Sequence, residues 1–248
     1  MTSRQEEILK TLIKEYVKKA EPISSSFLAG RCVRLPDGQG FDCSPATLRA
    51  EMMELEKNGY LRQPHTSAGR VPTDKAYRFF VDHLLQEKEK EKPLPEKYRQ
   101  AIDQSIAHSP DDAHAISSGL AKTMANLTDD FVISGIADTG EFYRMGFSNI
   151  LESPEFEERD DFFSFGNIFD EFENYFSNFF RQTRPKEVVV YIGKENPASP
   201  NEAVIITRYP LPEGYEGVSA VIGPIRMAYD RNLALLKYIT KKMNENYE

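Results

Sequence analysis

The stretch "SPATLRAEMMELEKNGYLRQPHTSAGRVPT", residues 44–73, predicts a helix that is followed at once by a tight hairpin. Ser44 is a good N-cap, and Pro45 suits the first helical position, where its missing N–H costs nothing. Gly59 after Asn58 is a typical helix terminator because glycine adopts the left-handed conformation easily. Both ends of this helix are therefore specified locally.

The apolar residues of this helix recur at helical spacing and predict one buried face: Leu48, Met52 and Leu55. Thr47, Arg49 and Ala50 are left near the exposed first turns. A helix that presents a hydroxyl, a guanidinium and small side chains can enter the major groove of DNA. Its first N–H groups also favour phosphate.

A two-stranded hairpin, or wing, is expected from residue 62 to residue 72. "YLRQ" and "RVPT" have the composition of short strands, and the polar "PHTSAG" joins them as a turn. Arg62 and Arg70 lie on its arms, where they are expected to meet phosphate more than bases. A turn histidine, His65, could sense pH or touch DNA, or be simply exposed.

Two more helices are expected before residue 44. The first runs from about Ser3 to about Ala20 and begins with a Ser3–Glu6 capping box, and the second is a short helix capped by Ser24. The following "RCVRLPDGQGFDC", residues 31–43, is expected to form a loop or small hairpin. Three helices and a wing indicate a winged helix-turn-helix, with a generic helical bundle plus hairpin as the alternative.

The charge is distributed unevenly along the 248 residues. Residues 1–80 hold 13 Lys and Arg against 10 Asp and Glu, a net charge of +3. Because the whole chain has a net charge of −8, residues 81–248 carry −11. A basic head on an acidic body can be attracted to phosphate locally. With no run of roughly 18 apolar residues and a polar N-terminus, we expect a cytoplasmic protein without a membrane span.

Four stretches resemble the HrcA family of heat-inducible transcription repressors, and they occur in that family's order. The most specific is "PHTSAGRVPTDKAYR", residues 64–78, within a longer match over residues 44–85. The others are "GFSNILESPEF" at 146–156, "YIGKENP" at 191–197 and "GPIRMAY" at 223–229. Two features depart from the family pattern: Ala50 replaces a usual Asn, and residues 31–43 are longer than the usual turn.

The resemblance implies a repressor that binds double-stranded DNA at an inverted-repeat operator upstream of chaperone genes. It implies a homodimer, and the chaperonin GroEL as a partner that maintains the active state. Together with Arg62, the residues expected on DNA are those at the start of the recognition helix and on the wing: Ser44, Ala46, Thr47, Arg49, His65, Thr66, Ser67, Gly69 and Arg70.

The second half is expected to be α+β, and within its helical residues 96–128 either Ser109 or Asp111 is expected to cap a second helix. Valine- and isoleucine-rich strands predict an antiparallel or mixed sheet, and residues 165–180 predict a helix with a phenylalanine stripe that either faces the core or forms a dimer contact. The resemblance implies that this body is GAF-like and reduced, because most of the inserted dimerisation domain of the family is missing. We therefore expect a winged helix-turn-helix domain at 1–86, a linker at 87–95 and a shortened GAF-like domain at 96–248.

Catalysis, a metal and a cofactor have no support in the sequence. The chain has no P-loop, no G-x-S-x-G, no H-E-x-x-H and no G-x-G-x-x-G, and its four histidines and two cysteines are scattered. Two other functions stay open: a protein-interaction module that docks a chaperonin, and a ligand-gated sensor built on the GAF-like body. Lys194 and Glu195 could line a ligand loop or a plain turn, and Arg226 could hold an anion or belong to a strand-to-helix connection.

Overall fold

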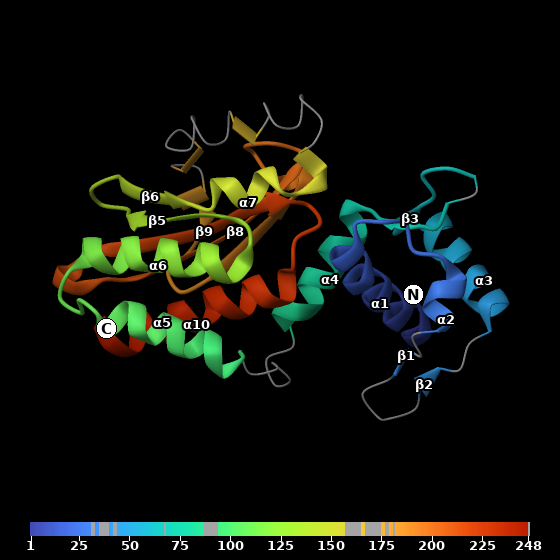
Figure 1. Ribbon diagram of the computed structural model, residues 1–248, viewed down its shortest axis with the longest axis horizontal. Helices are drawn as coiled ribbons and strands as arrows, with labels where there is room; N and C mark the ends of the chain where they lie inside the picture. Colours follow the sequence, from blue (N-terminus) through green and yellow to red (C-terminus); the bar gives the residue numbers. More distant parts are fainter. Residues whose placement is uncertain are drawn as a thin grey trace. The chain divides into compact units, whose positions relative to one another are not determined.

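The computed structural model describes residues 1–30, 33–34, 40–41, 44–66, 68–86, 94–156, 165–166, 175–176, 179–180 and 182–247. The chain divides into two compact units, Met1–Gln86 and Glu87–Glu248. We call them the head and the body, and their elements are labelled in Figure 1. Most of the linker expected at 87–95 lies outside the described residues, but Leu94 is buried and Pro95 is the N-cap residue of the next helix.

The head begins with helix α1, Ser3–Lys19. Its capping box lies one residue earlier than expected, because Thr2 Oγ1 accepts from the Gln5 amide at 3.2 Å and Gln5 Oε1 accepts from the Thr2 amide at 3.0 Å. The Ser3–Glu6 box was therefore wrong, since Thr-x-x-Gln satisfies the same two donors. The apolar stripe of α1 is buried: Ile8, Leu9, Leu12 and Ile13.

Helix α2, Ser25–Ala29, is capped by Ser24 as expected and packs on α3. Strands β1, Val33–Arg34, and β2, Gly40–Phe41, pair antiparallel, which confirms a small hairpin in residues 31–43. The rest of that hairpin lies outside the described residues.

Helix α3, Pro45–Lys57, has the predicted ends and the predicted buried face. Gly59 adopts φ +78°, its amide donates to Glu56 O at 2.9 Å, and the Tyr60 amide donates to Leu55 O at 2.9 Å. This pair of bonds is a Schellman motif, which satisfies carbonyls that the helix end would leave unpaired. Leu48, Met52 and Leu55 are buried, so the opposite side of the helix faces solvent.

The wing consists of strands β3, Leu61–Arg62, and β4, Val71–Pro72, paired antiparallel. Arg70 also forms a bridge with Ile23, each amide donating to the other's carbonyl at 2.9 Å. Helix α4, Asp74–Gln86, follows, and its Ala76 amide reaches the Thr73 hydroxyl at 3.4 Å. The head thus has the order α-α-β-β-α-β-β-α, in which α3 and the β3–β4 hairpin are the parts expected of a winged helix.

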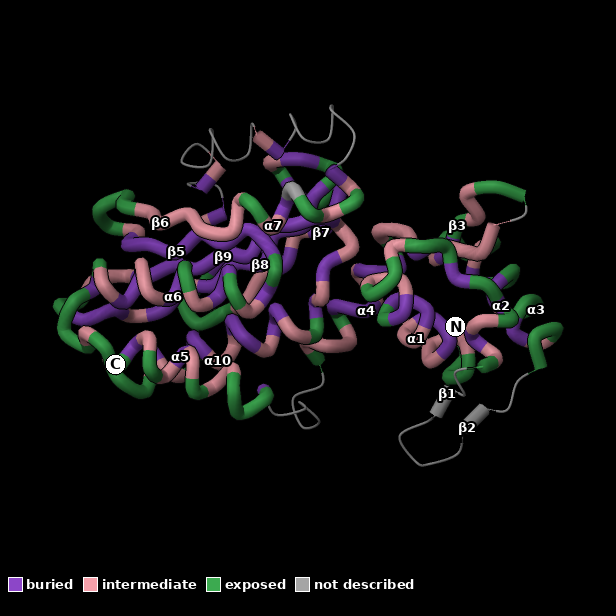
Figure 2. Tube along the Cα trace, viewed as in Figure 1, coloured by how far each residue is buried: buried purple, intermediate pink, exposed green. Residues whose placement is uncertain are grey.

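The body is built on a five-stranded antiparallel sheet with the order β6-β5-β9-β8-β7. Its strands run β5 Phe131–Ile136, β6 Glu141–Met145, β7 Val188–Ile192, β8 Glu202–Pro210 and β9 Glu216–Pro224. Figure 2 shows the three central strands, β5, β9 and β8, as almost wholly buried. The expected α+β class is therefore confirmed, with an antiparallel sheet.

Helices α6, Ala113–Thr128, and α10, Tyr229–Tyr247, pack on one face of this sheet, and α5, Glu96–Ala107, packs on these two helices (Figure 1). Asp112 caps α6 by accepting from the His114 and Ala115 amides at 2.9 Å, so neither Ser109 nor Asp111, the expected caps, is the cap. A buried polar group lies on this face, where Tyr209 Oη contacts Ser219 Oγ at 2.7 Å and Ser134 Oγ at 3.2 Å. Burial raises the pKa of Tyr209 above its ordinary value of 10.0, which keeps the phenol neutral.

The other face of the sheet carries a phenylalanine-rich core. Helix α7, Phe147–Leu151, and the 3₁₀ turn η1, Pro154–Phe156, pack there. Phe165, Phe176 and Phe179 are buried in this core, and Phe165 meets the Phe131 ring edge-on at 5.5 Å between centroids. The described part of the stripe in 165–180 therefore faces the core, whereas Phe169 and Phe172 lie outside the described residues.

Candidate nucleic-acid interface

The exposed start of α3 presents four of the expected DNA-contacting residues. Ser44, Ala46 and Arg49 are exposed, and Thr47 is half-buried. Ser44 Oγ accepts from the Thr47 amide at 3.1 Å and lies 3.0 Å from the Thr47 hydroxyl. These two hydroxyls therefore hold the helix start in place, and within the described residues no hydrogen bond or ion pair occupies the Arg49 guanidinium.

Glu51, the first acidic residue of α3, is bound by side chains of α1. Glu51 accepts from Gln5 Nε2 at 3.0 Å and forms an ion pair with Arg4 at 3.6 Å. Its charge is therefore compensated within the head, so it opposes an approaching phosphate less than a free carboxylate would.

The turn of the wing is closed by one side chain. Gln63 Nε2 donates to the carbonyl oxygens of Thr66 at 3.0 Å and Ala68 at 2.9 Å. His65 and Thr66 are exposed on this turn, and the Ala68 amide donates to His65 O at 2.9 Å. Ser67 lies outside the described residues.

The return arm of the wing is attached to the rest of the head. Arg70 Nε donates to Glu56 Oε2 at 2.9 Å, and only 12% of the Arg70 side chain is exposed. At Gly69 any Cβ would lie 2.4 Å from the Ile23 carbonyl carbon, so only glycine allows this close approach of two backbones. Gly69 and Arg70 thus attach the wing, whereas Arg62 on the other arm is exposed.

The residues predicted to contact DNA, so far as the structure describes them, therefore fall into two groups. Those on α3 and the wing turn, with Arg62, are accessible, while Gly69 and Arg70 lie where the wing meets Ile23 and α3. Sequence reasoning missed Gln63 and Glu56, since a glutamine next to a turn and a glutamate on a helix have no distinctive local signal.

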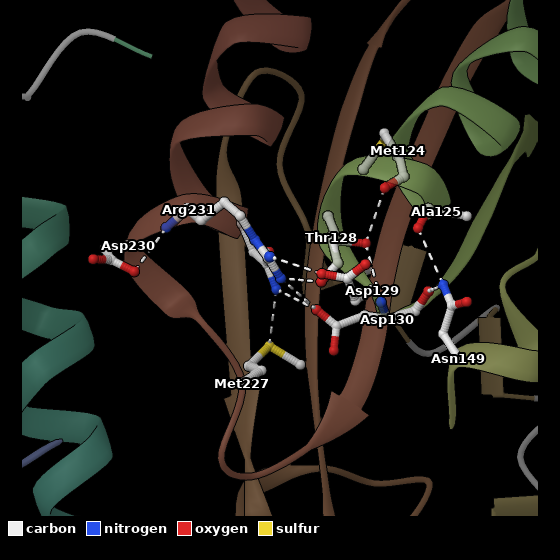
Figure 3. Close-up of polar contacts among 10 residues, drawn as sticks. Met124, Ala125, Thr128, Asp129, Asp130, Asn149, Met227, Asp230 and Arg231 are labelled. Carbon is white, nitrogen blue, oxygen red and sulfur yellow. Dashed lines mark hydrogen bonds and ion pairs between the residues drawn. The ribbon is translucent and has the colours of Figure 1, made fainter. Parts of the chain in front are cut away.

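The body has a buried polar cluster where β5 begins and α10 begins (Figure 3). Asn232 Nδ2 donates to Asp130 Oδ2 at 2.8 Å, and Arg231 lies 3.6 Å from the same oxygen and also donates to Thr128 O. Burial raises the pKa of Asp130 from 3.8 to about 6, against the lowering effect of Asn232 and Arg231. Asn232 and Arg231 occupy the Asp130 carboxylate, so the cluster connects the segment before β5 to the start of α10 and is not an open binding site.

The two ligand sites considered in the body have structural explanations. Arg226 forms a bidentate pair with Glu155, with Nη2 to Oε2 at 2.9 Å, which connects the strand-to-helix segment to η1. Burial acts to raise the pKa of Glu155, but the hydrogen bonds from Arg226 and Ser153 and the charge of Arg226 together hold it below its ordinary value. Lys194 and Glu195 belong to a 3₁₀ turn, Gly193–Glu195, between β7 and β8. An open groove of about 430 Å³ runs between α5 and α6.

The described residues contain no group of three His, Cys, Asp or Glu side chains arranged to hold a metal ion. No helix among them combines the length and apolar character needed to cross a membrane.

The chain is therefore an α+β protein of two units: a head whose third helix has one exposed side and is followed by a hairpin, and a body built on an antiparallel sheet. The model of the HrcA protein C-terminal domain matches residues 76–233, which is more than half of the chain. The chain therefore belongs to the HrcA family, and its body is the GAF-like α+β domain of that family.

Named relatives and a solved structure agree with this assignment. The heat-inducible transcription repressor HrcA of Natranaerobius thermophilus is 54% identical over 82 residues, which is 33% of this chain and 22% of that protein. The repressor of the same name from Thermobifida fusca is 40% identical over 133 residues, 54% of this chain and 35% of that protein. The matches thus span only about a fifth to a third of these relatives' length.

The crystal structure of a hypothetical protein superimposes with a TM-score of 0.79 at 19% sequence identity. It covers 99% of this chain and 98% of that chain, which supports the fold over both units.

Proposed function

We propose that this chain is a DNA-binding transcriptional repressor that controls chaperone genes through an inverted-repeat operator. The start of α3 enters a major groove, and the wing turn lies against the neighbouring backbone. Family membership supports the regulatory role, because the matched relatives are named as heat-inducible transcription repressors. Such a role requires no catalysis and is exercised in the cytoplasm, where chromosomal DNA lies.

The observation that carries this proposal is the exposed side of α3. Its apolar face is buried in the core of the head, and its N-terminus is capped by Ser44. Arg49 is exposed to solvent and has no partner among the described residues. Exposed Arg62 adds a second cation for phosphate at the adjacent wing.

Binding of the purified chain to a duplex from its own chaperone promoter tests the proposal. Fluorescence anisotropy at two salt concentrations should show at least ~1,000-fold tighter binding to the inverted repeat than to a scrambled duplex, and binding should weaken steeply as salt rises. Equal and weak binding of both duplexes contradicts the repressor function and favours a protein-interaction module.

The variant Arg49→Ala should weaken operator binding by about 1–3 kcal/mol and relax the preference at one base pair. Its thermal unfolding should stay close to that of the wild type, because no described contact holds the side chain. Systematic substitution of each operator base pair identifies the position. A uniform loss across all sequences would instead indicate a phosphate contact.

The operator-bound form is proposed to be a homodimer. One head makes few contacts, and two heads held at half-site spacing convert the second binding step into an intramolecular one. Sedimentation of the protein with a full operator and with a single half-site checks this: the full operator should take up two chains cooperatively.

A chaperonin of the GroEL type is proposed as the protein partner, on the basis of the family resemblance. Refolding from urea with and without the chaperonin should change the yield of operator-binding protein. Equal yields would remove this partner from the proposal without affecting DNA binding.

A further inference from the structure

One apolar side chain stands out on the exposed side of α3. Met53 is 56% exposed, and among the described residues only Met1 is another large hydrophobic side chain in the exposed class. Ala46 and Ala50 are also exposed and precede Met53 by seven and three residues. At 100° per residue these three positions lie on one line opposite the buried Leu48, Met52 and Leu55.

The charged neighbours of this line tell what kind of surface it can meet. Arg49 flanks it on one side and exposed Lys57 continues it towards the helix end. Exposed Glu54 borders it on the other side, where Asn58 Nδ2 donates to its carboxylate at 3.3 Å, and Glu51 is paired with Arg4 and accepts from Gln5. A hydrophobic protein surface would leave these cations without partners, whereas the edge of a duplex offers phosphates beside apolar groups.

The apolar group that a major groove offers is the 5-methyl of thymine. Ala46 and Ala50 are small, so the helix axis can approach the base edges closely. From Ala46 to Met53 the helix rises about 10 Å, the length of about three stacked base pairs.

We propose that Met53 is a specificity-determining residue that contacts a thymine 5-methyl group in each half-site, with Ala46 and Ala50 allowing the close approach. The inference rests on the proposed function and deepens it: the operator carries thymine where Met53 meets the groove. Its unbranched, polarisable side chain adapts to the methyl without a fixed hydrogen-bond geometry.

Replacing single thymines by deoxyuridine tests this contact, because the change removes only the methyl group and retains base pairing. The probes are versions of the inverted-repeat duplex from the chaperone promoter. In each version the thymine at one position is replaced by deoxyuridine in both half-sites. At the contacted position, wild-type protein should lose about fourfold in affinity per half-site. This is the change in affinity expected when one buried methyl group is removed. Met53→Ala should bind the thymine and deoxyuridine duplexes equally at that position.

Glu54→Ala serves as the matched control on the same helix. Removing this exposed carboxylate should change the affinity for both duplexes by the same factor and leave the methyl discrimination intact. Circular dichroism should confirm that both variants are folded, since neither side chain belongs to the core.

The possible results separate the inference from the function on which it rests. Specific operator binding with no deoxyuridine effect at any position overturns the inference and leaves the repressor function standing. A deoxyuridine effect that survives in Met53→Ala overturns it as well, because another residue then reads the methyl. Failure of wild-type protein to prefer the operator over a scrambled duplex overturns both.

Discussion

The Arg70 guanidinium already has a carboxylate partner, and this decides what the residue contributes. Its Nε lies 2.9 Å from Glu56 Oε2, and the side chain is mostly buried between the wing and α3. A phosphate that approached Arg70 would compete with Glu56 for the guanidinium charge, and only 12% of the side chain is exposed. Arg49, by contrast, loses nothing in the described structure when it turns towards DNA.

A double-mutant cycle at Arg70 and Glu56 measures this attachment. Arg70→Ala should lower the free energy of unfolding by about 1–3 kcal/mol, because it leaves the partly buried Glu56 carboxylate without its donor. Adding Glu56→Ala should cost less than in the wild-type background. Urea unfolding of the four proteins gives the coupling, and strictly additive losses would show that the pair contributes nothing.

At the scale of the element, the wing is a preformed loop. Gln63 donates to the Thr66 and Ala68 carbonyls, Gly69 packs on Ile23, and Arg70 pairs with Glu56, so contacts are distributed along both arms. Preorganisation of this kind reduces the entropy lost when the turn meets DNA.

Gln63→Glu should loosen the wing turn without unfolding the head. A carboxylate cannot donate to the two carbonyl oxygens and is repelled by them, so the amide of Ala68 should lose protection from hydrogen exchange and operator affinity should fall. Gln100→Glu on α5, where Gln100 contacts Glu96, is the matched control. Unchanged protection of the wing in Gln63→Glu would show that the clamp is dispensable.

At the scale of the whole molecule, the Asp130 cluster joins the segment before β5 to the start of α10. The groups that act on this carboxylate are Asn232, Arg231, Arg226 and the neighbouring Asp129, which come from both ends of the body sequence. Because the desolvation cost exceeds their attraction, the folded body binds a proton at Asp130 more tightly than the unfolded chain does.

The sign of the resulting pH dependence follows from the raised pKa. With a value of about 6 in the folded body against 3.8 ordinarily, this group favours folding fully below pH 3.8 and loses that contribution as pH rises through 6. The loss amounts to about 3 kcal/mol on this basis. Asp130→Asn should therefore gain stability relative to wild type between pH 4.5 and pH 7.5, measured by urea unfolding.

Asp129→Asn provides the control for this measurement, since that side chain is 84% exposed while it also contacts Arg231. Its stability relative to wild type should change little over the same pH range. An Asp130→Asn difference that is independent of pH would show that Asp130 keeps its ordinary pKa in the body.

The sequence by itself determined the elements whose signals are local. Caps, a terminating glycine and apolar spacing defined α3, and valine- and isoleucine-rich runs predicted the strands, because these patterns act within a few residues. Cap positions shifted by one residue at Thr2 and Asp112, where two neighbouring polar residues could each serve.

Only the tertiary structure decided which side chains are committed to each other. Arg70 and Glu56 are 14 positions apart, Gln63 and Ala68 are 5 apart, and Arg226 and Glu155 are 71 apart. The spacing of apolar residues along the chain does not predict such polar contacts. The Asp130 cluster joins residues about a hundred positions apart. Charge and hydrogen-bonding partners depend on distances in space, which chain folding sets, whereas helix and strand signals depend on distances along the chain.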